Sequence, residues 1–547
     1  MNRSAVGERT SGVDRDGVVE PAMPRLDVMS QNDGVQPPHP QDATDTVDRS
    51  FFGHPRGLKT LFGTELWERF SYYGMRAILL YYLTATIADG GLGLDSETGL
   101  AVTSIYGASV YLLSVVGGWL ADRVVGSRRA TLYGGVIIAL GHVLLAVPGS
   151  PGLSLAGIVA VAIGTGLLKP NVSSMVGELY GRDDDRRDSG FSIFYMGINI
   201  GSFSAPFLVG LARSIGGFHA GFAVAAVGMA LALVAFVLGR ARLRGAGEGV
   251  PNPLTAADRP LLVRGGLLLG GLLGAAALLA LAVTSAQAGQ ASFGTAGVVN
   301  TISYLAFAAP IIYFTVMLRS PKVTAPERSR VRAYIPLFVA AMLFWMIFEQ
   351  AASSMSAYAE SKTDLSVLGL TIQPEFFQSV NPALIIAFAP LFAWLWMRLG
   401  DRGPSTAVKF GIGLGLASLS FLFLAGMTAL AGDGLASSWV LLGTYVLQTL
   451  GELCLSPVGL AATTMLAPVA FRSQSMALWF LAPAAGQAIT AQIVSATSNL
   501  TDNFVPYFGT IGAVTLGLTV VFFFLTPWIT RHVAAGEHGL TGEVAKD

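Results

Sequence analysis

The stretch ELWERFSYYGMR, residues 65–76, carries four charged side chains inside a segment that otherwise has the composition of a membrane-spanning helix. It is preceded by LKTLFGT (58–64) and followed by AILLYYLTATIA (77–88), and both flanks are apolar. An ionised group near the centre of a bilayer costs roughly 2.5–3.5 kcal/mol on insertion scales. Charges kept at this cost indicate function, and they predict a helix face directed at protein or water rather than at lipid.

The composition of the whole chain agrees with a protein that crosses the membrane many times. Of its 547 residues, 52% are hydrophobic and 12% are charged, whereas soluble domains carry about 25% charged residues. The formal net charge of zero argues against a nucleic-acid partner. The single cysteine, Cys454, excludes an intrachain disulfide, and no metal or haem spacing is present, so we expect no metal and no cofactor.

Fourteen apolar segments are long enough to cross a bilayer as helices, which takes about 20 residues each. A closed barrel would show alternating polar and apolar residues, and these segments do not. The expected fold is therefore an all-α polytopic membrane protein. The predicted spans are 60–87, 98–121, 130–148, 152–178, 189–212, 217–240, 262–284, 295–318, 332–358, 376–399, 405–431, 436–467, 471–498 and 504–530.

Basic residues gather in alternate loops and so orient the chain. Arg123, Arg128 and Arg129 follow the second span, and similar clusters follow the fourth, sixth, eighth, tenth and twelfth. By the positive-inside rule both termini are expected in the cytoplasm, in a multi-pass protein of the cell membrane. Residues 1–57 have the composition of a disordered tail.

Two similar turns indicate an internal repeat. GGWLADRVVGSRR (117–129) follows the second span, and WMRLGDRGPSTAVK (396–409) follows the tenth. If spans seven and eight are an insertion, the turns occupy equivalent places in two six-helix halves, as in many secondary transporters; the alternative is two basic loops that merely look alike. The predicted parts are the tail 1–57, a six-helix bundle 58–240, a linker with two extra spans 241–331, a second bundle 332–530 and a tail 531–547.

The charges of the first span share one face. At about 100° per residue, Glu65, Glu68, Arg69 and Arg76 fall within an arc of about 100°. Glu65 and Arg69 form an i,i+4 pair. Arg76 lies about 12 Å further along the axis than Glu68 and has no acidic neighbour on its own helix, so its partner must come from elsewhere.

Three other spans contribute an ionisable residue. Lys169 precedes Pro170, Glu349 lies in LFWMIFEQAASSM (343–355), and Glu452 lies shortly before Pro457. These charges have one purely structural explanation, a network that holds the helices together. Apolar residues would do so at lower cost, so a pathway for a solute and protons is the favoured interpretation.

Together these residues resemble the proton-dependent oligopeptide transporter family, within the major facilitator superfamily. Residues 65–74 are similar to its first-helix signature, acid-x-x-acid-Arg-Phe-x-Tyr-Tyr-Gly, and FSIFYMGINIGSF (191–203) is similar to its second. The resemblance covers nearly all of the chain after residue 57. It implies two six-helix bundles with two inserted helices, and a symporter that imports di- and tripeptides with protons by alternating access.

The same resemblance implies roles for individual residues. Proton coupling would fall to Glu65, Glu68, Arg69 and Glu349. Arg76 and Lys169 would receive the peptide carboxylate and Glu452 its amino terminus. Asn199 and Asn381 would bind its backbone, beside Tyr72, Tyr73 and Tyr111, with Trp345 and Trp479 forming side-chain pockets. Two gating pairs are implied, Arg76 with Glu349 on the extracellular side and Lys169 with Glu452 on the cytoplasmic side.

Other functions fit the sequence less well. The alternative cargo is another small solute, such as nitrate or a peptide-like drug. Phe348 stands where some family members carry a second acid, so the proton count does not transfer. A channel needs a ring of like residues, an enzyme needs a catalytic cluster, and an ATPase needs a phosphate-binding loop; none is evident. His142 is expected to pack, and we assign no role to His54. The protein is expected to act as a monomer in the lipid bilayer.

Overall fold

The computed structural model describes residues 48–543 except 182–183, 289–292, 368, 498 and 501–502. Most of the predicted N-terminal tail therefore lies outside the described residues. The long helices are α1 (Arg56–Thr84), α2 (Ser96–Leu120), α3 (Ser127–Ala146), α4 (Pro151–Glu178), α5 (Arg187–Gly239), α6 (Arg259–Ala288), α7 (Gly294–Arg319), α8 (Ala325–Phe348), α10 (Val380–Leu399), α11 (Thr406–Ala431), α12 (Ser438–Leu466), α13 (Arg472–Ser495) and α14 (Phe504–Glu543).

Short elements lie between the long helices. They are α9 (Ser354–Ser361), the π-helical turn η1 (Ala121–Val125), and the 3₁₀ turns η2 (Arg240–Leu243), η3 (Ala256–Asp258), η4 (Glu349–Ala352), η5 (Pro374–Ser379), η6 (Gly400–Arg402) and η7 (Val469–Phe471). Strand β1 (Thr363–Asp364) pairs in parallel with β4 (Ala436–Ser437), and β2 (Ser366–Val367) pairs antiparallel with β3 (Leu370–Thr371).

The fourteen predicted spans are all present in the described part of the chain. Twelve helices there are long and apolar enough to cross a membrane. Helix α5 counts once among them, although its backbone leaves helical geometry at Gly216 and Gly217 and divides it into two arms. Gly217 has φ +76°, a conformation that suits glycine. Counting the two arms of α5 separately adds one span, and the charged helix α1 adds another, which gives fourteen.

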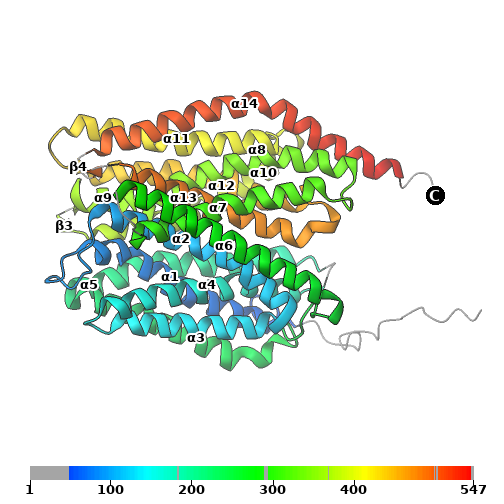
Figure 1. Cartoon of the computed structure of the whole chain (residues 1–547), viewed down its shortest axis with the longest axis horizontal. Helices are drawn as coiled ribbons and strands as arrows, with labels where there is room; N and C mark the ends of the chain where they lie inside the picture. The colour runs from blue at the N-terminus through cyan, green and yellow to red at the C-terminus, as the bar shows by residue number, and fades with distance from the viewer. Residues whose placement is uncertain are drawn as a thin grey trace, which may run out of the picture. The chain divides into compact units, whose positions relative to one another are not determined.

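The helices run back and forth between two ends of the molecule (Figure 1). One end holds the start of α1 and the arginine-rich turns after α2, α4 and α5; we call it the basic end. The opposite end holds α9 and the four short strands. Helices α1–α5 pack on one another, α8 and α10–α14 form a second group, and α7 contacts α2 and α13 beside α6.

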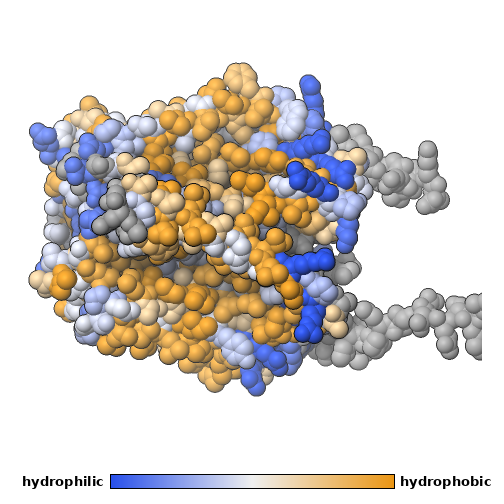
Figure 2. All heavy atoms as spheres, viewed as in Figure 1, coloured by the Kyte–Doolittle hydropathy of each residue, from blue (hydrophilic) through white to orange (hydrophobic). Residues whose placement is uncertain are grey.

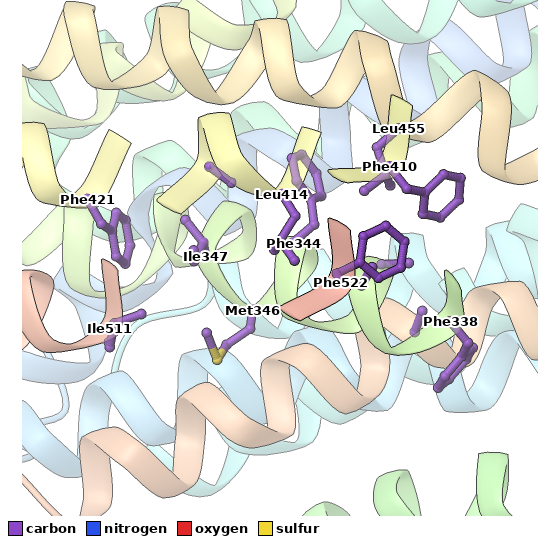
Figure 3. Packing of buried hydrophobic residues seen from close by; sticks show 14 of the residues in the cluster. Phe338, Phe344, Met346, Ile347, Phe410, Leu414, Phe421, Leu455, Ile511 and Phe522 are labelled. Atoms are coloured by element: carbon purple, nitrogen blue, oxygen red, sulfur yellow. The ribbon is translucent and has the colours of Figure 1, made fainter. Parts of the chain in front are cut away.

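Each group has its own apolar core. In the second group, aromatic and aliphatic side chains from α8, α11 and α14 interlock, among them Phe344, Phe421 and Ile511 (Figure 3). The cluster of the first group includes Met75, Leu79 and Phe222. Apolar side chains also cover the outside, where they form a broad band between two more hydrophilic ends (Figure 2). Outward apolar residues over such a band are those that lipid contacts.

The two repeated turns both follow a long helix. The turn η1 ends α2, the second span of the first group, and η6 ends α10, the second span of the second group. Each chain reversal passes through a glycine with positive φ, Gly126 at +81° and Gly400 at +47°. After η1, the backbone N–H of Arg128 donates to the carbonyl of Gly247 at 2.8 Å. The segment after α5 is thereby attached to this turn.

Candidate functional site

The charged face of α1 is buried inside the first helix group. Arg69 Nε lies 3.1 Å from Glu65 Oε1 and 2.5 Å from Glu68 Oε2. All three residues are at most 2% exposed. Glu65 Oε2, Glu68 Oε1 and Arg69 Nη2 find no hydrogen-bond partner among the described residues. Two carboxylates thus share one guanidinium, which leaves this group one positive charge short.

Glycines on α5 make this burial possible. A Cβ at Gly201 would lie 2.3 Å from the carbonyl oxygen of Leu66, and one at Gly197 would lie 2.9 Å from the ring of Phe62. On the α1 side, a Cβ at Gly74 would lie 2.6 Å from Val209. The small residues of the second signature therefore let α5 approach the α1 backbone closely, as expected of glycines in packed membrane helices.

Arg76 finds its partner on the other helix group. Its guanidinium forms an ion pair with Glu349, which begins η4 where α8 ends. A second, longer contact joins Arg76 Nη2 to the Glu349 carbonyl at 3.3 Å. The Tyr111 hydroxyl donates to Glu349 Oε1 at 3.1 Å. The predicted pair of Arg76 and Glu349 is therefore formed, and it joins α1 and α2 to the turn after α8.

Lys169 and Glu452 do not form their predicted pair in this structure. Lys169 Nζ lies over the ring of Tyr111, 4.1 Å from its centroid, where the negative face of the ring stabilises a cation. Glu452 instead accepts a hydrogen bond from Asn381 Nδ2 at 2.9 Å. The same nitrogen donates to Thr449 Oγ1 at 3.0 Å. Each charge thus has a partner within its own helix group.

The remaining predicted residues lie in different surroundings. Tyr72 and Tyr73 contact each other edge to face, with ring centroids 5.2 Å apart. Asn199 donates to the carbonyl of Tyr195, one turn earlier on α5, at 2.9 Å. Trp345 packs edge-on against Phe348, and its Nε1 has no partner among the described residues. Trp479 belongs to the apolar core of the second group and is 5% exposed.

Two neighbouring residues were missed by the sequence reasoning. Thr449 completes the group around Glu452, and its place one turn earlier on α12 was a usable signal. Tyr106 stacks on Tyr72, with centroids 6.3 Å apart. It lies on α2 five residues before Tyr111, a spacing that does not put the two side chains on the same helix face.

The two histidines noted in the sequence have ordinary partners. His142 is fully buried and lies 2.6 Å from Ser71 Oγ, as expected of a packed residue. His54, before α1, lies 2.9 Å from the Tyr180 hydroxyl. Burial, with a smaller contribution from Arg186, lowers the pKa of His54. The described residues contain no cluster of His, Cys, Asp and Glu that could hold a metal ion.

Comparison with known proteins gives one consistent family. A family model described as the POT family matches residues 128–514. A di-/tripeptide transporter of Lactococcus lactis subsp. cremoris is 46% identical over 478 residues, which are 86% of this chain and 95% of the relative.

Solved structures agree with this match. A mutant of peptide transporter POT in complex with alafosfalin is 50% identical, with a TM-score of 0.81 over 89% of this chain and 97% of its own. A POT family transporter in complex with 5-aminolevulinic acid is 40% identical, with a TM-score of 0.81 over 88% and 98% of the two chains.

Proposed function

This chain belongs to the POT family, and we propose that it is a proton-coupled symporter that imports di- and tripeptides by alternating access. The observation that carries the proposal is the arrangement of charge across the two helix groups. Arg76 and Lys169 lie on α1 and α4, and Glu452 lies on α12 of the other group. A zwitterionic peptide has a carboxylate and an ammonium group that match these opposite charges.

In this proposal the peptide carboxylate binds at Arg76 and Lys169, and the amino terminus binds at Glu452. Lys169 is held only by the Tyr111 ring among the contacts described above, so a carboxylate can approach it without breaking an ion pair. Asn381 orients the Glu452 carboxylate, and Asn199 is assigned to the peptide backbone. Tyr72, Tyr73 and Trp345 provide rigid aromatic surface for variable side chains.

Proton coupling is assigned to Glu65, Glu68, Arg69 and Glu349. Two carboxylates around one guanidinium are balanced best when one of them is neutral, because both buried negative charges share Arg69 as their ion-pair partner. A proton arriving at Glu65 or Glu68 would relieve this imbalance. A proton arriving at Glu349 would release Arg76 for the peptide carboxylate, and so it would link proton binding to substrate binding.

The proposal of alternating access rests on the two helix groups being joined at one end of the molecule and not at the other. The Arg76–Glu349 pair ties the two helix groups together toward the end opposite the basic turns, whereas Lys169 and Glu452 remain apart. By the positive-inside rule the basic end faces the cytoplasm, with both termini there. The described conformation then corresponds to an inward-facing state of a carrier that acts as a monomer in the cell membrane.

Uptake into liposomes tests this function. Purified protein should accumulate radiolabelled Ala-Ala when the outside is acidic, and accumulation should stop when a protonophore collapses the gradient. Equilibration without accumulation would contradict proton coupling.

A second candidate cargo is a small non-peptide zwitterion, because one related structure holds 5-aminolevulinic acid. Competition separates the two. Excess unlabelled dipeptide should inhibit Ala-Ala uptake more strongly than 5-aminolevulinic acid or nitrate, and the reverse order would favour the second candidate.

A further inference from the structure

The helix that leads to Glu349 breaks at this residue. Helix α8 ends at Phe348, Glu349 begins the 3₁₀ turn η4, and α9 starts at Ser354. A break inside the membrane frees backbone groups, which must find other hydrogen-bond partners because lipid offers none. The direction of the Glu349 side chain is set by this turn, so it depends on the groups that hold the turn in place.

The side chain of Gln350 bridges the break from within. Its Nε2 donates to the carbonyl of Met346, in the last turn of α8, at 3.0 Å. Its Oε1 accepts a hydrogen bond from Ser354 Oγ, at the start of α9, at 2.5 Å. Gln350 and Ser354 are both 0% exposed. A buried amide whose oxygen and nitrogen are both bonded makes the turn rigid, because each bond would be costly to leave unmade.

Two neighbouring helices of the second group hold the same bridge from outside. On α14, the Tyr507 hydroxyl donates to Gln350 Oε1 at 2.8 Å. On α13, Thr490 Oγ1 donates to the carbonyl of Met346 at 3.0 Å. Tyr507 and Thr490 are both buried. The turn that carries Glu349 is thus attached to the body of the second group by buried hydrogen bonds.

Glu349 and Gln350 are adjacent in the chain but point in different directions. A 3₁₀ turn has about three residues per turn, so consecutive side chains diverge by about 120°. Gln350 bonds to α14 of the second group, whereas Glu349 pairs with Arg76 of the first group. Among the described residues, neither Gln350 nor Tyr507 forms a hydrogen bond or ion pair with Arg76. Their influence on the ion pair must therefore pass through the turn.

From this geometry we infer that Gln350 and Tyr507 are positioning residues, which fix η4 so that the Glu349 carboxylate meets Arg76 when the two helix groups close at this end. The inference rests on the proposed function, in which this ion pair controls alternation. It adds two residues that are assigned to neither the peptide nor the protons. Loss of the Tyr507 hydroxyl loosens the turn, misplaces the carboxylate and weakens the pair.

A distance measurement tests this inference without requiring transport. Spin labels at Ile215→Cys on α5 and Trp439→Cys on α12, both exposed at the end opposite the basic turns, report the separation of the two groups in a variant lacking the single cysteine, Cys454→Ala. Tyr507→Phe removes only the hydroxyl that bonds to Gln350. We expect the ratio of long to short distances to rise roughly two- to tenfold, the equivalent of one neutral hydrogen bond.

A double-mutant cycle shows whether Tyr507 acts through Glu349. Glu349→Gln removes the charge of the ion pair and should by itself shift the distances more than Tyr507→Phe does. In the Glu349→Gln background the pair is already lost, so Tyr507→Phe should add no further shift. A merely structural role would give the same factor in both backgrounds, since the effects of independent sites add. That result would overturn the inference.

Tyr334→Phe is the matched control. Tyr334 is 4% exposed and Tyr507 5%, and both belong to the second group, but the Tyr334 hydroxyl bonds to Thr463 instead. Its removal should leave the distances unchanged. If the distances shift as expected in Tyr507→Phe while the wild-type protein fails to accumulate Ala-Ala, the positioning role stands and the assigned cargo falls.

A second variant reaches the same amide from the other side. Ser354→Ala removes the other hydrogen bond to Gln350 Oε1, and it should shift the distances only when Glu349 is present. It also decides the matter if Tyr507→Phe does not fold. Wild-type distances in both Ser354→Ala and Tyr507→Phe would overturn the inference as well.

Discussion

Two charged groups on α1 lie within a few helical turns of each other, yet they are held in different ways. Glu65, Glu68 and Arg69 form ion pairs with one another within a single helix, so these contacts can survive a movement of the two helix groups. Arg76 pairs with Glu349 on the other group, so its contact depends on that movement. The cluster of Glu65, Glu68 and Arg69 is suited to holding a proton. The pair of Arg76 and Glu349 is suited to controlling the conformational state.

The largest effect is expected at Lys169, a cation assigned to the substrate carboxylate. Lys169→Ala should abolish concentrative uptake of Ala-Ala, because the substrate carboxylate loses a cation that contacts the Tyr111 ring and forms no ion pair within the described residues. Uptake into liposomes with an inward proton gradient measures this. Lys59→Ala, on the exposed side of α1, is the control and should transport normally. Wild-type accumulation by Lys169→Ala would remove Lys169 from the site.

A smaller and more selective effect is expected at Glu452. Glu452→Gln removes the charge from a hydrogen bond to the peptide ammonium group, worth on the order of 1.5–3 kcal/mol. Affinity for Ala-Ala should therefore fall roughly ten- to hundredfold, as measured by competition with labelled dipeptide. An N-acetylated dipeptide lacks the ammonium group and should lose far less. Equal losses for both ligands would limit Glu452 to a gating role.

Physical reasoning from the sequence predicted the spans and the need of Arg76 for an acidic partner on another helix, whereas the choice of Glu349 came from the family resemblance. Long apolar runs and helical periodicity are local properties, and an unpaired arginine facing inward requires a distant acid. The separation of Lys169 from Glu452 was not predictable in this way, since it depends on which conformational state the two groups adopt. The ion pair of Arg213 on α5 with Glu375 in η5 was missed because both residues lie near helix ends, where a charge costs little and gives no signal.

The smallest effect should come from packing alone. Gly201→Ala places a methyl group against the α1 backbone near Leu66 and should destabilise the protein by about 1–3 kcal/mol through overpacking. A lower melting temperature in detergent measures this. Gly426→Ala, which meets nothing within 4 Å, is the control. An unchanged melting temperature for Gly201→Ala would mean that α1 and α5 are less tightly packed than described.

The central claim is that the carboxylates within α1 couple transport to protons, while the contacts between the helix groups control alternation. Glu68→Gln tests it most directly, because it fixes one carboxylate in a neutral form without changing its shape. Glu248→Gln, which removes an exposed carboxylate in the same way, is the control variant. The measurement compares two readouts in the same liposomes, proton-driven accumulation of labelled Ala-Ala and exchange of labelled for unlabelled Ala-Ala. The account predicts that Glu68→Gln loses accumulation and keeps exchange; accumulation at the wild-type level would contradict it and would leave Glu349 as the leading coupling residue.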